Sequence, residues 1–330
     1  MTLKVLLTGG SGFVATHVLQ KLLEHGHKVV TTVRSDEKGR YLLDLFKGNP
    51  VTYTVVQDIA AEGAFDEAVK SDPPFDAVIH TASPFHYNVQ DNKRDMIDPA
   101  VNGTTGILKA IVKFAPSVRH VVITSSFAAI SNPKAPPKVY SEEIWNDMTM
   151  EEALTTKNPQ AAYRASKTFA EQAAWEFVKI QKPHFGLTVL NPPMIYGPVI
   201  HEVASLDALN TSSIRILDLL LGKPRDGPVG SPIYVDVRDL ALAHVLSIEK
   251  PEASGQRIFM AAGMGSEKEM GDIIKRSFPE LAKNVRDDLV ADMPPYGIDN
   301  SKAKKILGIT YRSLEETVVD TVKSLQALGA

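Results

Sequence analysis

A tyrosine and a lysine one helical turn apart are the first residues whose types and spacing suggest chemistry. Tyr163 and Lys167 lie in "YRASK", inside a stretch with the apolar spacing of an amphipathic helix, and a spacing of four places both side chains on one face. Of the nine tyrosines, only Tyr163 has a lysine four residues further on. A nearby ammonium favours the phenolate, so the pair is suited to proton transfer, unless it is only a surface contact.

Two serines follow an apolar run that is predicted to be a strand. "HVVIT" at 120 to 124 ends at Ser125 and Ser126, and ligands of open parallel sheets bind at the carboxyl ends of the strands. One of the two hydroxyls is expected to hold a substrate oxygen on which negative charge develops. Together with Tyr163 and Lys167, this would make a proton-transfer site.

A glycine pattern near the start of the chain predicts a dinucleotide site. "LLTGGSGFVA", residues 6 to 15, places Gly9, Gly12 and Ala15 between a strand and a helix. Small residues there allow a tight turn, a close approach to a pyrophosphate and close packing of helix on strand, and the helix N-terminus offers free N–H groups. A plain strand-to-helix turn would also use glycine, but the position at the head of an alternating series favours dinucleotide binding, and the tyrosine and lysine suit a nicotinamide cofactor. Tyr163 would then protonate a carbonyl oxygen as hydride reaches its carbon.

The end of the second expected strand predicts which dinucleotide is bound. An acidic residue there would bind the ribose 2'-hydroxyl of NAD, whereas "TTVRSDEK" has Arg34 at that place and Lys38 a turn later, so NADPH is expected. Asp36 is interpreted as the cap of the next helix, although an acidic residue so close leaves an NAD site as the alternative. Arg34 could also be a solvated loop cation.

Alternating strands and helices predict an α/β protein with a Rossmann-type, doubly wound parallel sheet. A helix is expected from Phe13 to Gly26, because Val14, Val18 and Leu22 form one apolar stripe. The expected strands lie at 4–7, 28–33, 51–56, 76–80, 120–124 and 187–191.

A smaller, mostly helical substrate lobe is expected after residue 190. A helix over 211–222 would be capped by Thr211 or Ser212 and end at Gly222. The domains are therefore predicted as 1–190 with 232–260 returning to it, and 191–231 with 261–330; "QRIFMAA" at 256–262 would be a strand and 266–330 mostly helical. The proline-containing stretch 130–143 is interpreted as either a lid or a surface loop.

Composition narrows the class of partner. The net charge of −3, without long runs of one sign, does not indicate binding to nucleic acid or to an anionic membrane. Zero cysteines exclude disulfides and thiolate chemistry. His25 and His27 around Gly26 are interpreted as a solvated turn, so no metal is predicted. The N-terminal stretch lacks a signal pattern or an apolar run of the roughly 20 residues that a membrane span needs, so a cytoplasmic protein is expected, monomeric or homodimeric.

These motifs, in this order, resemble the extended short-chain dehydrogenase/reductase superfamily. More narrowly, the chain is similar to the branch of dihydroflavonol reductases and the yeast NADPH-dependent methylglyoxal and carbonyl reductases. The likeness covers nearly the whole chain and is carried by "HTASPF" at 80–85, "AVNGTTGILKA" at 100–110, "YRASKTFAEQAAWEF" at 163–177, "YVDVRDLALAH" at 234–244 and "DNSKAKKILGITY" at 299–311, the last resembling the family's closing helix and strand.

The resemblance implies roles for individual residues. It makes Ser126 the serine that orients the substrate, with Ser125 its neighbour, beside the catalytic Tyr163 and Lys167. The expected cofactor contacts are, at the glycine turn, Gly9, Ser11, Gly12, Phe13 and Val14; at the 2'-phosphate, Arg34 and Lys38; at the adenine, Asp58 and Ile59; along the cleft, Thr81, Ala82, Ser83, Val101 and Thr124; and at the nicotinamide, Tyr163, Lys167, Pro192 and Met194.

The expected substrate pocket is largely apolar and is formed by Phe85, Phe127, Met194 and Tyr196, unless these are simply core residues. The family's segment "NPVYVFGP" reads "NPPMIYGP" here, which leaves the preferred carbonyl open and suggests a roomier pocket. The resulting hypothesis is an NADPH-dependent carbonyl reductase. The alternatives are an NAD-dependent sugar-nucleotide epimerase or dehydratase, which Arg34 and an apolar pocket disfavour, and a non-catalytic dinucleotide sensor, which would not need a proton donor.

Overall fold

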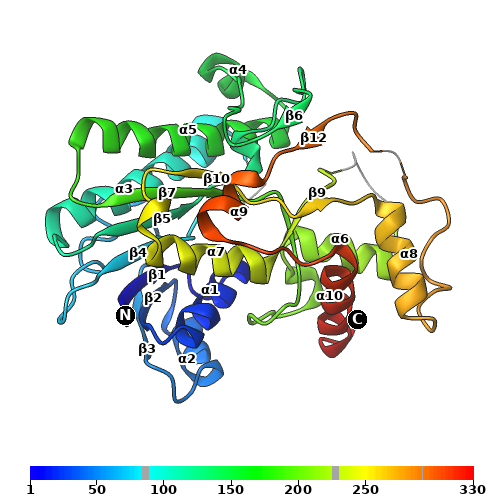
Figure 1. Cartoon of the computed structure of the whole chain (residues 1–330), viewed down its shortest axis with the longest axis horizontal. Helices are drawn as coiled ribbons and strands as arrows, with labels where there is room; N and C mark the ends of the chain where they lie inside the picture. Colours follow the sequence, from blue (N-terminus) through cyan, green and yellow to red (C-terminus); the bar gives the residue numbers. More distant parts are fainter. Residues whose placement is uncertain (84–88, 225–229, 292) are drawn as a thin grey trace.

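The computed structural model of the chain describes residues 1–83, 89–224, 230–291 and 293–330. In these residues seven parallel strands form one sheet in the order β10-β7-β5-β4-β1-β2-β3 (Figure 1). The strands are β1 (Lys4–Thr8), β2 (Lys28–Val33), β3 (Val51–Val55), β4 (Ala77–His80), β5 (His120–Thr124), β7 (Gly186–Asn191) and β10 (Arg257–Phe259). Each apolar run of the sequence became a strand with its ends within one residue of the prediction, and "QRIFMAA" supplied the seventh. The doubly wound parallel sheet is therefore confirmed.

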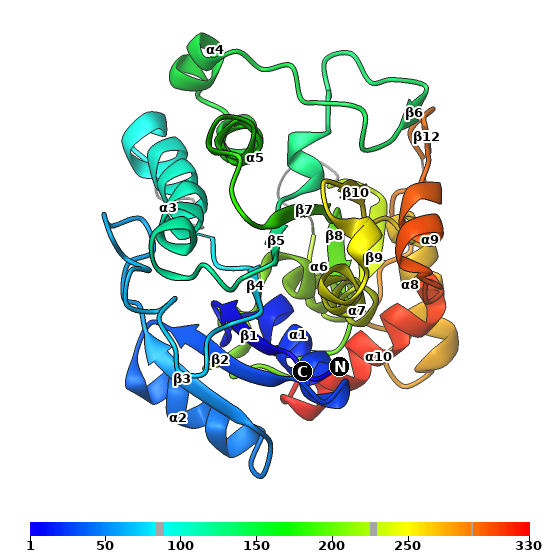
Figure 2. The ribbon, with the colours of Figure 1, turned by 60° about the vertical axis from the view of Figure 1, so that its left-hand side comes forward.

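Helices cover both faces of this sheet, as Figure 2 shows. On one face lie α3 (Asp98–Phe114) and α5 (Pro159–Gln181), and on the other α1 (Phe13–Glu24) and α7 (Val237–Glu249), with α2 (Asp36–Leu45) beside β2 and β3. The predicted stripe of α1 buries Val18 and Leu22 against the sheet. The order of the strands reverses between β1 and β4, and in such sheets the ligand crevice lies at the carboxyl ends of the strands near this point.

The second lobe has a small sheet of its own. Within the described residues, β8 (Met194–Tyr196) pairs with β9 (Ile233–Asp236), which also pairs with β11 (Gly263–Met264). Helices α6 (Thr211–Leu220), α8 (Glu267–Ser277) and α10 (Leu314–Ala327) pack around it in one apolar cluster. Since β9 belongs to this lobe, the chain returns to the large sheet with α7 and β10.

The C-terminal third is divided between the two lobes. Helix α9 (Ser301–Leu307) buries Ala303 and Leu307 in the same cluster as Val245 of α7 and Ile258 of β10, so it packs on the large domain. The resemblance implied a strand after this helix, but residues 308–313 form none, because Gly308 turns the chain with a φ of 72° and α10 follows.

Two predicted helix caps were one residue off. Asn210 is the N-cap of α6, so the prediction of Thr211 or Ser212 is wrong. Ser35 caps α2 by accepting from the Lys38 N–H, so Asp36 is not the cap. Asp36 lies in the first turn, where its negative charge interacts favourably with the positive end of the helix dipole.

The stretch 130–143 is held to the rest of the molecule by several contacts, among them hydrogen bonds from Arg257 and Phe259 to Glu142. Its strand β6 (Val139–Tyr140) pairs with β12 (Gly297–Ile298), and the buried Tyr140 hydroxyl donates to the Asn132 carbonyl while accepting from the Asn132 N–H. The remaining elements are α4 (Met150–Thr155), a π-helical turn at Lys93–Ile97, and 3-10 turns at Phe127–Ala129, Leu206–Ala208 and Pro251–Ala253. Across the described ranges, every helix is too short or too polar to cross a membrane.

Candidate active site

The glycine turn joins β1 to α1 in the way that a phosphate cradle requires. Gly9 has a φ of 74°, and a Cβ there would lie 3.1 Å from the Ala82 Cα. Gly12 is the N-cap of α1 and makes no side-chain cap bond, so the first N–H groups of the helix are left for a ligand. The predicted contacts Ser11, Phe13 and Val14 follow in this turn.

Sequence reasoning missed the groups that hold this turn. Gly10, absent from the predicted set, is the sterically most constrained glycine of this turn, since a Cβ there would lie 2.0 Å from Thr31 Oγ1. Thr32 accepts from the Gly9 N–H with its hydroxyl at 3.0 Å and from the Gly10 N–H with its carbonyl at 2.9 Å. The doubled glycine in "TGGSG" was the available signal for Gly10, but nothing in the spacing indicated the threonines of β2.

The two cations expected at the 2'-phosphate lie near each other on the chain but in different environments. Arg34 is exposed and has no hydrogen bond or ion pair with another described residue. Lys38 forms an ion pair of 2.7 Å with Glu202, from the segment that follows β8. At the expected adenine site, Asp58 is exposed and accepts from the Ala60 N–H, while Ile59 is half-buried and faces Gly103 of α3.

The end of β4 is tied to the end of β1 by hydroxyl groups. Thr8 accepts from the Ala82 N–H at 3.1 Å and contacts His80 Nδ1 at 2.9 Å, and the Thr81 hydroxyl donates to the Thr8 carbonyl. Burial, with a smaller effect of the Lys167 charge, lowers the pKa of His80 to about 3, so the ring is neutral. Ser83, the next predicted cleft residue, accepts from Lys167 Nζ at 2.6 Å.

Tyr163 and Lys167 lie together on α5, as the spacing predicted. Lys167 Nζ is 5.8 Å from the centroid of the Tyr163 ring, and its hydrogen bond to Ser83 directs the ammonium toward the end of β4. Burial lowers the pKa of Lys167 to about 8, which keeps most of its charge at neutral pH. An ammonium so placed stabilises a phenolate on Tyr163.

The two serines after β5 have different partners. The Ser125 hydroxyl donates to Glu171 at 2.5 Å and is buried. The half-buried Ser126 accepts from the Ala128 N–H at 3.1 Å, which leaves its own hydrogen to be donated to a substrate oxygen. Of the two hydroxyls, that of Ser126 is therefore the one available to a substrate, and its role stays a prediction.

The remaining predicted residues lie around this centre. Thr124 places its hydroxyl 2.7 Å from His244 Nε2 of α7, and Val101 of α3 packs against the apolar cluster that contains Ala165 of α5. Pro192 is buried and accepts from the Phe127 N–H, whereas Met194 is half-buried.

The expected pocket residues have the surroundings of core side chains. Phe127 stacks on Phe259 with centroids 5.3 Å apart, and Tyr196 is buried in the cluster of the second lobe. Burial raises the pKa of the Tyr196 phenol. Phe85 lies outside the described residues, and the pocket assignment stays a prediction.

The histidine turn differs from its prediction. His25 is exposed, but His27 is only 1% exposed, and Glu249 Oε1 lies 3.0 Å from a ring nitrogen of each. The Leu3 N–H donates to His27 Nδ1, so Nε2 carries the ring hydrogen and donates to Glu249. This tautomer leaves His27 no lone pair for a metal, although the three possible ligand atoms lie within 4.8 Å of one another. The prediction of a solvated turn is wrong for His27.

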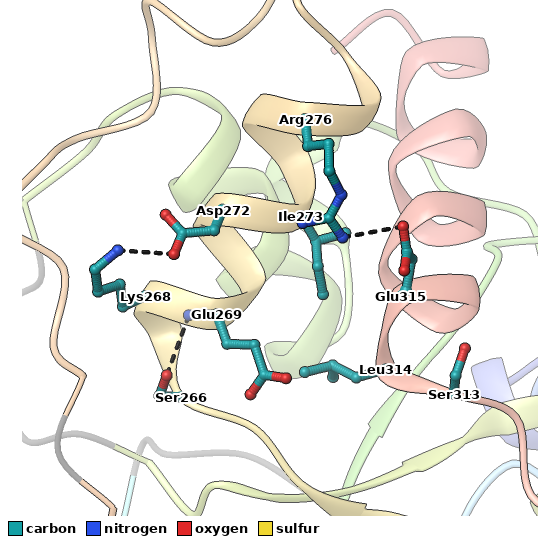
Figure 3. Close-up of a pocket in the computed structure, with 9 residues that line it drawn as sticks. All are labelled: Ser266, Lys268, Glu269, Asp272, Ile273, Arg276, Ser313, Leu314 and Glu315. Atoms are coloured by element: carbon teal, nitrogen blue, oxygen red, sulfur yellow. Dashed lines mark hydrogen bonds and ion pairs between the residues drawn. The ribbon is translucent and has the colours of Figure 1, made fainter.

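A groove of about 490 Å³ lies between α8 and α10, away from these residues (Figure 3). Four of its charged side chains form two ion pairs, Lys268 with Asp272 at 2.7 Å and Arg276 with Glu315 at 3.0 Å. None of the predicted site residues within the described ranges lines this groove, so its polar groups carry no part of the proposed chemistry.

Comparison with known proteins places this arrangement in a family. Residues 5–262 match the model of the NAD dependent epimerase/dehydratase family. The chain is 48% identical to ketoreductase azaE of Aspergillus niger, over 98% of this chain and 97% of that protein. It is 37% identical to the NADPH-dependent methylglyoxal reductase GRE2 of Saccharomyces cerevisiae, over 98% of both.

A solved structure agrees in fold. The crystal structure of Gre2 in complex with NADPH from Candida albicans superimposes with a TM-score of 0.92 at 37% identity, over 99% of this chain and 100% of that one. The match therefore includes the glycine turn, the large sheet and the second lobe together. By sequence and by fold, the chain belongs to the NAD dependent epimerase/dehydratase family, within the extended short-chain dehydrogenases/reductases.

Proposed function

We propose that the chain is an NADPH-dependent carbonyl reductase that converts an aldehyde or ketone to an alcohol. The observation that carries this proposal is the Lys167 ammonium, which lies beside the Tyr163 ring while bonded to Ser83 at the end of β4. Tyr163 would then act as the proton donor, and Lys167 as the charge that activates it, at the carboxyl edge of the sheet where a dinucleotide is expected to bind. The names of the relatives, a ketoreductase and a methylglyoxal reductase, support the same reaction.

The residues present fit a nicotinamide dinucleotide phosphate. The Gly9–Gly12 turn has no room for side chains at Gly10, and the uncapped start of α1 offers N–H groups to a pyrophosphate. Arg34 is an exposed cation at the end of β2, where it would bind a 2'-phosphate together with Lys38. When bound, the reduced nicotinamide supplies the hydride.

The side chains would divide the proton chemistry among them. The Ser126 hydroxyl donates a hydrogen bond to the carbonyl oxygen and fixes its position. Tyr163 gives its proton to the same oxygen as negative charge develops there. The charge of Lys167 stabilises the phenolate that is left, and its ammonium would also bind ribose hydroxyls.

The substrates to test are chosen from the expected pocket. Met194, half-buried at the start of β8, would border a largely apolar pocket, so small aldehydes, 2-oxoaldehydes, diketones and aryl ketones are the substrates to test. The experiment follows the loss of reduced-nicotinamide absorbance with NADPH, and in parallel NADH, against this panel. Turnover with NADPH on any of them would support the proposal. NADPH binding without turnover on the whole panel would overturn it.

A further inference from the structure

A carboxylate lies on the same helical face as the proposed catalytic pair. Glu171 follows Lys167 by four residues and Tyr163 by eight, so all three project from one side of α5 (Pro159–Gln181). Glu171 is 2% exposed, which is unusual for an ionised side chain unless it is fully paired.

The carboxylate accepts hydrogen bonds from three strands' ends. Its Oε2 accepts from the Ser125 hydroxyl at 2.5 Å and from Asn191 Nδ2 at 2.7 Å, and its Oε1 accepts from Arg257 Nε at 2.5 Å. These donors come from the end of β5, the end of β7 and the start of β10. Glu171 thus connects α5 to three neighbouring strands of the large sheet.

Two of these donors, Asn191 and Ser125, are directly connected to Ser126. The Asn191 amide, which donates to Glu171, also donates to the carbonyl of Ser126 at 3.2 Å. Ser125 directly precedes Ser126. The position of the Ser126 hydroxyl therefore depends on the same carboxylate that fixes the helix of Tyr163.

Arg257 anchors the segment that follows Ser126. Its NH1 donates at 2.6 Å to the carbonyls of Glu142 and Ile144, its NH2 donates to that of Ala129, and its guanidinium lies 3.6 Å from the centroid of the Trp145 ring. Through these contacts the ion pair extends from α5 to the chain immediately after the serine.

We propose that Glu171 is a positioning residue, whose buried carboxylate fixes α5 against the end of β5 so that Tyr163 and Ser126 meet at one carbonyl oxygen. The inference rests on the proposed reductase function for the identity of that oxygen. Glu171 does not touch the reacting atoms; it acts through Ser125, Asn191 and Arg257. An ionised carboxylate suits this task because it accepts several charge-assisted hydrogen bonds at once.

The first test compares two variants that each neutralise a buried carboxylate. Glu171→Gln should lower kcat about 100-fold, because a displacement of about 1 Å between reacting groups can cost that much, with the KM for NADPH within about two-fold of wild type. The control is Asp239→Asn on α7, on the other face of the sheet from α5, which breaks the ion pair of the equally buried Asp239 with Arg312. It should lower the thermal midpoint comparably and change kcat by less than about two-fold. Equal kcat in Glu171→Gln and wild type, or equal losses in both variants, would overturn the proposal.

A milder variant covers the case in which Glu171→Gln fails to fold. Ser125→Ala removes one hydrogen bond to Glu171 and keeps the ion pair with Arg257 at 2.5 Å. It should fold, lower kcat by about three- to ten-fold and leave the KM for NADPH unchanged, which corresponds to the loss of one hydrogen bond. A wild-type kcat in this variant would contradict the link between Glu171 and the serine.

A readout without turnover separates this inference from the proposed function. The Tyr163 ring, labelled with ¹³C and assigned by its loss in Tyr163→Phe, can be titrated by NMR in the cofactor-free protein. In Glu171→Gln the midpoint should rise, because a displaced Lys167 stabilises the phenolate less, while Asp239→Asn should titrate as wild type. An unchanged or lower midpoint would sink the positioning role, whether or not the wild type reduces carbonyls.

Discussion

The ends of β1 and β5 lie at the same edge of one sheet, yet they are held by different kinds of contact. At β1, the contacts described for the glycine turn come from neutral groups, the hydroxyls and carbonyls of Thr8, Thr31 and Thr32. At β5, the contacts centre on the buried ion pair of Glu171 with Arg257.

The difference matches what each end has to do. A turn that binds phosphate depends on free N–H groups and a positive potential, which a nearby carboxylate would reduce. A site that transfers a proton depends on the orientation of a few side chains. A carboxylate that accepts hydrogen bonds from three segments holds those segments in fixed positions relative to one another. The comparison predicts that changes near β5 stop chemistry and spare cofactor binding, and that changes near β1 do the reverse.

The largest effect is expected at the proton donor. Tyr163→Phe should lower kcat by about 10³-fold or more and leave the affinity for NADPH within about two-fold, because only the proton is lost. Steady-state kinetics and a fluorescence titration with NADPH measure the two. Tyr311→Phe is the matched control, since the buried hydroxyl of Tyr311 has no hydrogen-bond partner in the described part of the chain. A Tyr163→Phe enzyme with near wild-type turnover would remove Tyr163 from its proposed role.

The converse change lies in the glycine turn. Gly10→Ala places a methyl group 2.0 Å from Thr31 Oγ1, so the turn or β2 must move, at a cost of about 1–3 kcal/mol of stability. Affinity for NADPH should fall about ten-fold or more, with kcat at saturating cofactor changed far less. Gly106→Ala lies on α3, where the added carbon has no described atom within 4 Å, and should behave as wild type. A loss confined to kcat would contradict the comparison.

The choice between the two dinucleotides should depend on one cation. Arg34→Asp should change the ratio of kcat/KM for NADPH over NADH by about 10²-fold toward NADH, because a charge-assisted contact with the 2'-phosphate is replaced by repulsion. Arg40→Asp makes the same change of charge at an exposed site on α2 and serves as control. Equal ratios in the two variants would place phosphate binding elsewhere.

The rate of carbonyl reduction should depend on pH through the charge of Lys167. Since burial lowers the pKa of Lys167 to about 8, its charge is present below that pH and is lost above it. The phenolate on Tyr163 then loses its stabilisation, so log kcat for carbonyl reduction should fall by up to one unit per pH unit above about pH 8. In Lys167→Arg, whose guanidinium stays charged, the fall should vanish even if the overall rate is lower. A wild-type profile that stays level to pH 9.5 would argue against the assignment.

The smallest effect is expected at Glu202. Its ion pair with Lys38, 2.7 Å long and partly exposed, competes with a 2'-phosphate for the same ammonium. Glu202→Gln should raise the affinity for NADPH by about two- to five-fold at low salt, the range of an exposed ion pair, and the gain should shrink as salt screens it. The exposed Glu252 on the Pro251–Ala253 turn gives the control Glu252→Gln. The same gain in both variants would mean that only net charge matters.

The sequence by itself determined the features that depend on short spacings. Short apolar runs predicted the strands of the sheet, glycines marked the turn after β1, and the helical period placed Tyr163 and Lys167 on one face. Each rests on residues within about one or two turns of each other, so local geometry alone decides it.

Only the tertiary structure decided which distant groups meet. The donors to Glu171 are 46, 20 and 86 residues away, and His27 is buried with a glutamate 222 residues further on. The period that revealed Lys167 continues to Glu171, but its partners could not be read from it. Such contacts form because neighbouring strands of a doubly wound sheet come from distant parts of the chain, and the position of each is set by burial of the whole core rather than by local propensity.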